Sequence, residues 1–307
     1  MKKITGIIVL VLTMALLFAA CAQNNTTPSE TVSESASQSV ETSEQPSESA
    51  SEQHEEAIIK VAGSTSVGPV IEALKEKYTE THPWVTINVE QTGSGAGVTS
   101  CGDGTADMGM SSRNLKEEEQ TTYPDMKTTL LCVDGLAIVV SKDNPVTELT
   151  KDQVKQIFLG EITDWSEVGG TAGPITLYSR DSVSGTREAF QTLFLGKDDK
   201  GEQIEIDDTM CLIVDSNGAM GTQVEGDASG IGYMSLGLVG EHNLTGLTID
   251  GVQATTDNLI NGTYTYFRNF NLLTMGEPTG ELKNFMDYCL SDPVALGYLE
   301  EKGYLLP

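Results

Sequence analysis

The sequence predicts an α/β fold in which a parallel sheet presents its binding loops at the carboxyl ends of the strands. An apolar strand pattern, a turn of small residues and a helical pattern follow one another repeatedly along the chain. Parallel strands need such crossovers. The residues from Ile58 to Pro307, about 250 in number, are enough for two ordinary domains. The β-rich run Leu130–Val140 is long enough to pass from one domain into the next, with Gly135 as a candidate bend.

The first part of the folded region alternates strands with helices. Val85, Ile87 and Val89 alternate with polar residues, as is typical of a half-buried strand. Helical spacing begins at Val67, and Pro69 falls in the first turn, where proline is tolerated. These patterns predict a strand at Ile58–Ala62, a helix from Val67 to Tyr78, a strand at Pro83–Gln91, a short helix near Ala96–Cys101 and a strand at Asp107–Ser112.

The later part contains further strands and helices but no internal repeat and no second linker. We therefore expect the two domains to share crossing strands, with domain I formed by 58–137 plus 268–307 and domain II by 138–267. Thr150 is the expected N-cap of its first helix. The predicted elements are helices at Lys151–Leu159, Arg187–Leu195, Leu282–Leu290 and Val294–Gly303, and strands at Pro174–Ser179, Ile231–Leu236 and Tyr264–Leu273.

The N-terminus has the pattern of a secretion signal. Two lysines precede an apolar run from Ile7 to Ala20, which is short for a membrane span. Phe18-Ala19-Ala20-Cys21 looks like the lipobox of bacterial lipoproteins, although Leu is usual at its first position. We predict a signal peptide at 1–21 and a lipid anchor on Cys21 at the extracellular face of the cell membrane. The alternative is an ordinary signal peptide cut near Ala20 or Ala22.

Residues 22–57 are predicted to be a disordered tether. They consist almost only of Ser, Glu, Thr, Gln, Pro and Ala, with eight acidic residues and no Lys or Arg. Such a segment cannot bury enough apolar surface to offset the entropy of ordering. As a flexible coil, about 35 residues have a root-mean-square span of roughly 30–35 Å.

The formal net charge of the chain is −27. The signal contributes +2 and the tether −8, which leaves −21 for the folded part. This charge argues against nucleic acid or an anionic membrane surface as partner. An anion must therefore bind against the overall field, through local dipoles in a closed site. The sequence has only four arginines, which are Arg113, Arg180, Arg187 and Arg268.

Three turns of small residues each precede a helical pattern. They are Gly63-Ser64-Thr65-Ser66, Gly93-Ser94-Gly95-Ala96-Gly97 and Ser184-Gly185-Thr186. A helix N-terminus has unpaired N–H donors and partial positive charge, so it attracts anions. Arg180 stands four residues before Ser184, and a guanidinium matches two oxygens of a tetrahedral oxyanion. The pattern indicates one dehydrated oxyanion held by neutral donors and a single guanidinium. The alternative for this stretch is an ordinary capped helix with a surface arginine.

Catalysis is the competing hypothesis, with Ser94 or Ser184 as the nucleophile of a cell-surface serine hydrolase or phosphatase. Such a serine needs a general base, and the folded part offers only His82 and His242, neither in a recognisable motif. The sequence contains no clustered metal ligands and no nucleotide-binding motif. We therefore expect no enzyme, no cofactor and no metal site.

The cysteines of the folded part match no zinc motif. We favour an interpretation as buried small hydrophobic residues over disulfide bonds, of which three pairings are possible. The four residues are Cys101, Cys132, Cys211 and Cys289.

Several separated motifs of this sequence resemble the phosphate-binding lipoproteins that serve phosphate-specific ABC transporters. The resemblance covers essentially Ile58 to Pro307. It implies a type II periplasmic-binding-protein fold, in which two α/β domains are joined by crossing hinge strands and close on a ligand in the cleft. The motifs are Gly63–Ser66, Gln91–Gly97, Ala106–Arg113, Leu149–Trp165, the Arg180-x-x-x-Ser184-Gly185-Thr186 stretch and Gly230–Tyr233.

The resemblance also implies a function and a set of ligand residues. The protein would be an extracytoplasmic receptor that binds inorganic phosphate and delivers it, as a monomer, to an ABC permease with its ATPase. The alternative within the same fold is another oxyanion, such as sulfate, molybdate or tungstate. The ligand residues implied, position by position, are Thr65, Ser66, Ser94, Ser112, Arg180, Ser184, Gly185 and Thr186.

Two positions depart from the enteric pattern of the family. Ser112 stands where an Asp accepts the phosphate proton, and Ser182 stands where an Asp steadies the arginine. Rejection of sulfate is therefore the least secure implication. Asp181 is either the partner of Arg180 or a solvated surface residue. Arg113 is either a second cation at the cleft or a surface charge after a strand. Arg187 lies one position into its helix, and we expect it to pair with acidic neighbours such as Glu188.

Overall fold

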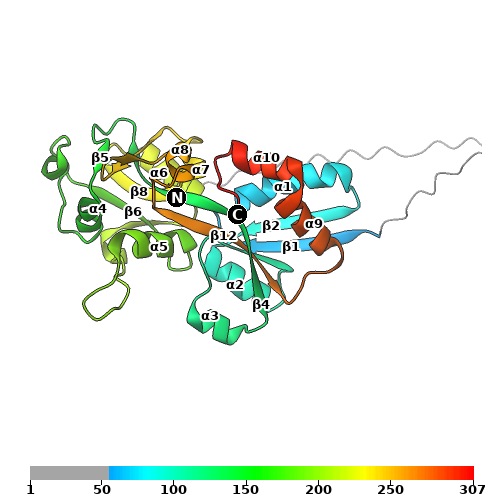
Figure 1. Cartoon of the computed structure of the whole chain (residues 1–307). Helices are drawn as coiled ribbons and strands as arrows, with labels where there is room; N and C mark the ends of the chain where they lie inside the picture. The colour runs from blue at the N-terminus through cyan, green and yellow to red at the C-terminus, as the bar shows by residue number, and fades with distance from the viewer. Residues whose placement is uncertain (1–54) are drawn as a thin grey trace, which may run out of the picture. The chain divides into compact units, whose positions relative to one another are not determined.

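The computed structural model describes residues 55–307 (Figure 1). The predicted signal peptide, the lipidation site Cys21 and the predicted tether up to residue 54 lie outside the described residues. Strand β1 (Ala57–Gly63) begins at Ala57, the last residue of the predicted tether, so the tether ends at least one residue earlier than predicted. Residues 55–307 belong to one compact unit.

The described residues form a large mixed sheet and a small one. In the large sheet β1 lies between β2 and β3 with parallel pairing, and β6 lies between β7 and β8, also parallel. The two central strands, β12 (Phe267–Met275) and β4 (Met126–Ser141), run antiparallel to their neighbours. The order of strands in the large sheet is β2 (Val85–Gln91), β1, β3 (Met108–Ser111), β12 (Phe267–Met275), β4 (Met126–Ser141), β8 (Gly230–Ser235), β6 (Thr176–Arg180) and β7 (Leu212–Val214). Strand β9 (Leu244–Gly246) pairs with β4 at the side of this order. The order in the small sheet is β11 (Val252–Gln253), β10 (Thr248–Ile249) and β5 (Glu148–Leu149).

Strand β4 changes partner along its length. Its residues up to Gly135 pair with β12, and from Leu136 onward they pair with β8. The change therefore falls at the glycine that the sequence marks as a candidate bend. We call residues 57–135 and 267–307 the first lobe and residues 136–266 the second lobe. The predicted domain boundaries at 137 and 268 remain a prediction.

In the first lobe, helices cover both faces of the sheet. Apolar residues of α1, α9 and α10 pack with β1 and β3 in one core, which includes Leu74, Met108 and Phe285. A smaller core under α2 joins Val98 to Leu273 of β12. The helices of this lobe are α1 (Gly68–Thr81), α2 (Ser94–Gly102), α3 (Glu117–Thr122), α9 (Gly280–Ser291) and α10 (Pro293–Glu301).

The second lobe repeats this arrangement. One core packs α4, α5 and the π-helical turn Gln191–Leu195 on the sheet, and another packs α6 and α7 on the opposite face. Thr150 accepts a hydrogen bond from the backbone N–H of Gln153, which confirms the predicted N-cap. The elements are α4 (Lys151–Phe158), α5 (Gly185–Phe190), α6 (Asn217–Glu225), α7 (Leu236–Val239), α8 (Thr256–Ile260) and short 3-10 helices at Trp165–Val168 and Asp208–Met210.

Most predicted elements are present with shifted ends. The predicted helix Arg187–Leu195 is wrong in its ends and type, because α5 begins at Gly185 and gives way to the π-helical turn after Phe190. The predicted strand from Tyr264 begins only at Phe267. The polar helix α3 and the three-residue strand β7 had no periodic apolar signal to reveal them.

The four cysteines of the described part are free thiols. Cys101, Cys132 and Cys289 are buried within the apolar cores, and Cys211 is half-buried. This outcome confirms the interpretation as hydrophobic residues and leaves no disulfide in the described part.

Candidate anion site between the lobes

The first turn lies between β1 and α1. The hydroxyl of Ser64 accepts hydrogen bonds from the backbone N–H groups of Ser66 and Val67, at 3.2 and 3.3 Å. Ser64 thus satisfies local donors of the turn. The hydroxyls of Thr65 and Ser66, both buried, are therefore available for longer-range contacts.

The second turn precedes α2. Gly93 is the N-cap residue and has a φ of 95°, a conformation that favours glycine because it has no Cβ. No side chain caps this helix. The first helical residue, Ser94, accepts a hydrogen bond from the backbone N–H of Ser112 at 3.0 Å, and the two hydroxyls lie 3.2 Å apart. The end of β3 and the start of α2 are thereby joined.

The third turn lies on the second lobe and faces the other two. Ser184 is the N-cap of α5 and accepts from the backbone N–H of Arg187 at 3.2 Å, so part of its role is ordinary capping. The Thr186 hydroxyl lies 2.9 Å from that of Ser66. A Cβ added to Gly185 would lie 2.3 Å from the Ser94 hydroxyl oxygen, so the lobes meet closely here.

The structure brings the eight predicted ligand residues together between the lobes. Each is buried. They come from the starts of three helices and the ends of two strands, as expected for an α/β ligand site. These residues are Thr65, Ser66, Ser94, Ser112, Arg180, Ser184, Gly185 and Thr186.

Arg180, at the end of β6, is 1% exposed. Its guanidinium donates to the backbone carbonyls of Val214 (3.2 Å) and Asp215 (2.8 Å) and to the Thr65 hydroxyl (3.2 Å). Its Nη1 has no partner among the described residues. Burial lowers the pKa of Arg180, and the positive charge of Arg268 acts in the same direction.

Asp181 does not pair with Arg180 through a hydrogen bond or salt bridge of the described structure. Its carboxylate accepts from the backbone N–H of Val183 at 3.1 Å. Backbone carbonyls, rather than an aspartate, hold the Arg180 guanidinium in place.

Sequence reasoning missed three residues of the site. Asn217, at the start of α6, donates to the hydroxyls of Thr65 (3.1 Å) and Ser66 (2.8 Å). Arg268, on β12, donates to the Ser66 hydroxyl at 2.9 Å and forms a buried ion pair with Asp134 of β4 at 3.0 Å. The site thus contains two guanidinium groups and not the single one expected. The scarcity of arginine in an acidic chain is the only sequence signal that pointed to Arg268.

Asp134 is the one buried carboxylate of the described residues. Burial raises its pKa, while Arg268 and the hydroxyl of Ser235 act to lower it. Both of its oxygens are occupied, since Arg268 donates to one and Ser235 donates to the other at 2.8 Å. The predicted ligand residues themselves include no carboxylate.

Arg113 is neither a surface charge nor a ligand-facing cation of the set above. It is buried and donates to Glu119 at 2.7 and 2.6 Å and pairs with Glu188 of the second lobe at 2.9 Å. Arg187 does pair with an acidic residue, as predicted, but this residue is Asp208 and not the suggested Glu188. Arg187 points into the second lobe, where it contacts the carbonyl of Arg180 and pairs with Asp208, because its position on α5 faces the core.

The histidines do not support the catalytic hypothesis. His82 stacks on Tyr78 at a ring distance of 3.9 Å, and His242 lies 3.5 Å from a carboxylate oxygen of Glu225. Within the described part of the chain, neither histidine forms a hydrogen bond with Ser94 or Ser184. Within residues 55–307, no group of three or more His, Cys, Asp or Glu side chains is arranged to hold a metal ion, and no helix has the length and apolarity needed to cross a membrane.

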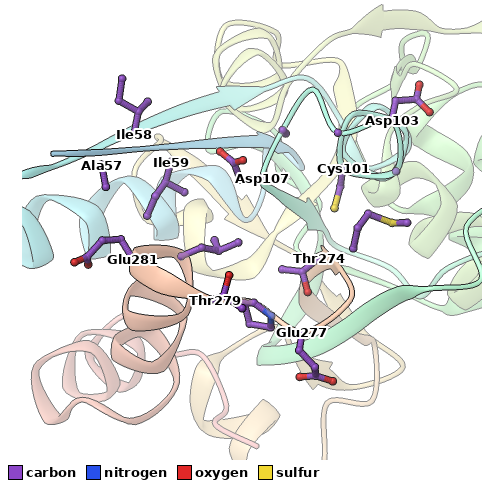
Figure 2. A pocket seen from close by; sticks show the side chains of 16 residues that line it. Ala57, Ile58, Ile59, Cys101, Asp103, Asp107, Thr274, Glu277, Thr279 and Glu281 are labelled. Atoms are coloured by element: carbon purple, nitrogen blue, oxygen red, sulfur yellow. The ribbon is translucent and has the colours of Figure 1, made fainter. Parts of the chain in front are cut away.

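A separate cavity of about 630 Å³ lies in the first lobe and is lined by none of the predicted ligand residues (Figure 2). Four carboxylates line it, from Asp103, Asp107, Glu277 and Glu281. Because these charges repel anions, this cavity is not a competing anion site.

Comparison with known proteins decides the family. A model described as the PBP superfamily domain matches residues 36–293. The phosphate-binding protein PstS of Bacillus subtilis (strain 168) is 31% identical to this chain over 250 residues, 80% of either chain. The chain belongs to this family of phosphate-binding proteins. It is a family of transport substrate-binding proteins, and the chain is accordingly not an enzyme.

Further members of the family extend the comparison. Phosphate-binding protein PstS 2 of Streptococcus agalactiae serotype V is 43% identical over 110 residues, 36% of this chain and 37% of the relative. Two solved structures have the type II fold expected. One, assigned to a phosphate ABC transporter of Clostridium perfringens and solved with bound phosphate, has a TM-score of 0.74 and 35% identity, covering 81% of this chain and 99% of that one. The other, an ABC-type phosphate transport receptor from Vibrio cholerae, has a TM-score of 0.65 and 34% identity, covering 81% and 100%.

Proposed function

We propose that this protein is an extracytoplasmic receptor that binds inorganic phosphate between its lobes and delivers it to an ABC permease for uptake. The observation that supports this most directly is the Arg180 guanidinium. It is buried, has no carboxylate partner in the described structure, and has an Nη1 without an acceptor. Such a group requires a bound anion to complete its interactions.

The proposed ligand residues match the chemistry of a tetrahedral oxyanion. Arg180 supplies a charge-assisted donor, and the hydroxyls of Thr65, Ser66 and Thr186 supply neutral donors around it. The starts of α2 and α5 add backbone N–H groups at the positive ends of the helices. We assign the same role to Ser94, Ser112, Ser184 and Gly185.

We further propose that phosphate release requires the lobes to separate. Direct contacts join the lobes around the site, among them the Ser66–Thr186 hydroxyl pair and a hydrogen bond of 3.0 Å from the backbone N–H of Gly95 to the carbonyl of Val183. An ion enclosed in this way is cut off from water. Rotation about the strands that join the lobes would open a path, as in other hinge proteins.

The location proposed for the receptor is the outer face of the cell membrane. Lipidation of Cys21 would anchor it, and the acidic tether would let it reach a permease and its ATPase as a monomer. Metabolic labelling with a fatty acid should mark the protein but not a Cys21→Ala variant. An unlabelled wild-type protein would contradict the anchor without affecting phosphate binding.

Titration calorimetry tests the central proposal. The purified protein is freed of bound anion by unfolding and refolding, and then titrated with phosphate and with sulfate from acidic to mildly alkaline pH. We expect stoichiometric phosphate binding. Equal binding of sulfate would indicate a general oxyanion receptor, since no carboxylate among the proposed ligand residues repels an unprotonated anion. Absence of binding by either anion would refute the proposal.

A further inference from the structure

Two guanidinium groups of the site each have a buried nitrogen without a hydrogen-bond acceptor in the described part of the chain. The Nη1 atoms of Arg180 and Arg268 are both buried and have no hydrogen-bond partner among the described residues. A buried N–H group that has lost water without gaining an acceptor is costly, and most such groups in native proteins are satisfied. Burial lowers the pKa of Arg180 and the charge of Arg268 adds to this, while the carboxylate of Asp181 acts to raise it. A shared anion would satisfy both donors.

A continuous set of hydrogen bonds joins the two guanidiniums. Arg180 donates to the Thr65 hydroxyl at 3.2 Å, and Arg268 donates to the adjacent Ser66 hydroxyl at 2.9 Å. Asn217 bridges these two hydroxyls, at 3.1 and 2.8 Å. Each guanidinium therefore donates directly to a hydroxyl of the same turn, Arg180 to Thr65 and Arg268 to Ser66.

This network fixes the direction in which the hydroxyls donate. The Thr65 oxygen receives N–H donors from Arg180 and Asn217, and the Ser66 oxygen receives them from Asn217 and Arg268. A hydroxyl oxygen has two acceptor sites, so both are filled at each residue and the O–H must donate elsewhere. The O–H of Ser66 can donate to the Thr186 oxygen, 2.9 Å away, or to a bound anion. The O–H of Thr65 is left to donate to an acceptor that is not a group of the protein.

The backbone holds Arg268 in this position. Arg268 and Asp134 are direct cross-strand partners in the antiparallel pairing of β12 with β4, and β4 is the strand that passes from the first lobe into the second. Nε and Nη2 of Arg268 donate to one oxygen of Asp134, at 3.1 and 3.0 Å. The aspartate thus offsets the charge of Arg268 and orients its fork, which leaves Nη1 as the free edge.

We propose that Arg268 is a second arginine ligand of the bound anion, donating through Nη1 while it holds Ser66 as a hydrogen-bond donor. This inference rests on the proposed phosphate-binding function. The two arginines then have different roles in binding. Arg180 brings a positive charge that has no carboxylate in direct contact among the described residues, and Arg268 brings a donor whose charge Asp134 already balances.

The test is phosphate titration of an Arg268→Lys variant beside the wild-type protein. Lysine keeps the charge and can pair with Asp134, but it lacks the planar fork that serves three partners at once. We expect phosphate affinity to fall by about tenfold to a hundredfold. Arg187→Lys is the matched control, because Arg187 is also buried but has partners for its guanidinium within the second lobe. It should lower the affinity by far less than Arg268→Lys, because its side chain contacts Arg180 at the backbone carbonyl and not at the guanidinium.

A second variant removes the question of folding. Asp134→Asn combined with Arg268→Gln deletes both charges of the pair, so no buried charge is left alone. We expect this double variant to lose phosphate affinity by a similar factor, and circular dichroism checks that it is folded. Wild-type affinity in either folded variant would overturn the inference and reduce the pair to a structural ion pair. Failure of the wild-type protein to bind phosphate would instead refute the proposed function.

A mutant cycle with Ser66→Ala separates direct contact from action through Ser66. If Nη1 of Arg268 donates to the anion, Arg268→Lys still weakens phosphate binding in the Ser66→Ala background. If the arginine acts only by orienting Ser66, its replacement has no further effect there. That second result would contradict the assignment of Arg268 as a ligand.

Discussion

Two polar clusters join the lobes of this protein, and their charges are matched differently. The anion site combines Arg180 and Arg268 with hydroxyl groups, and Asp134 is its one carboxylate. The second group, which we call the ion-pair cluster, consists of Arg113, Lys116, Glu119 and Glu188. Its Arg113 donates to both oxygens of Glu119 and pairs with Glu188, which Lys116 approaches to 3.3 Å.

The contrast shows which cluster needs a ligand. In the ion-pair cluster the protein supplies a carboxylate for every arginine donor that requires one, so the lobes are joined without help from outside. In the anion site two buried N–H groups stay without acceptors among the described residues. Because buried donors require acceptors, the proposed anion would complete the anion site, whereas the donors of the ion-pair cluster already have acceptors within the protein.

The largest effect expected is that of Arg180→Ala. It removes the cation that has no carboxylate in direct contact in the described structure, so phosphate affinity should fall by more than about a hundredfold. Arg113→Ala removes an arginine of similar burial from the ion-pair cluster and should weaken binding far less. Calorimetric titration of both variants gives the comparison, after thermal unfolding has shown that each is folded. Equal losses of phosphate affinity in the two variants would contradict the distinction between the clusters.

Gly185→Ala tests how closely the lobes must meet at the anion site. The added Cβ would lie 2.3 Å from the hydroxyl oxygen and 2.8 Å from the Cβ of Ser94, so the closed arrangement cannot form unchanged. We expect phosphate affinity to fall by roughly tenfold or more, by analogy with the strain of overpacked sites. Gly218→Ala is the control, since nothing lies within 4 Å of its added Cβ. Small-angle scattering with phosphate should show incomplete closure for Gly185→Ala only.

Acid should weaken the ion-pair cluster before it affects the arginines of the anion site. Burial acts to raise the pKa of Glu119, but hydrogen bonds from Arg113 and the backbone N–H of Lys116 outweigh it and the pKa lies below its ordinary value of 4.5. A lowered pKa in the folded state stabilises the protein above the ordinary value, and this contribution is lost as the pH falls through the folded-state pKa.

Urea unfolding measures this contribution. At neutral pH, Glu119→Gln should be less stable than wild type by about 1 kcal/mol, a value typical of a partly exposed pair with good geometry. The difference should shrink as the pH falls below the ordinary pKa of Glu119. A difference that is the same at neutral and acidic pH would assign the loss to packing instead of charge.

The smallest effect expected is that of Glu188→Gln. The Glu188 side chain is 32% exposed, so water screens its pairing with Arg113 and Lys116. Phosphate affinity should fall by about twofold to fivefold, with a smaller loss at high salt. Glu72→Gln is the control, because Glu72 pairs with Lys75 within helix α1 and touches only the first lobe. A salt-independent loss for Glu188→Gln would speak against an ionic contact between the lobes.

Local patterns in the sequence were sufficient to predict much of the anion site. Each small-residue turn can be identified from a few residues, because a glycine or serine turn before a helical pattern leaves unpaired N–H donors at the start of a helix. Arg180 stood close enough to Ser184 to be assigned with it. The resemblance to phosphate-binding lipoproteins then added Ser112, a position that no local pattern singled out.

The remaining residues of the site could not be found in this way. Arg268 and Asn217 stand more than 150 residues from Thr65 and Ser66, and they belong to no turn motif of their own. The pairing of Arg113 with Glu188 across the lobes was missed for the same reason, since Arg187 is the nearer arginine in sequence. Distance along the chain says nothing about which charges meet once two lobes close.

The sequence by itself determined the α/β class, the turns that precede helices and the chemical kind of ligand, because these follow from short-range periodicity and from the residue types within a turn. The tertiary structure alone decided which arginines keep a buried N–H group without an acceptor among the described residues and which have partners for their donors. The physical reason is that β4 and β12 align Asp134 with Arg268 across strands and place that pair beside Ser66. Burial and long-range pairing, which no short segment encodes, then distinguish an anion site from a set of ion pairs.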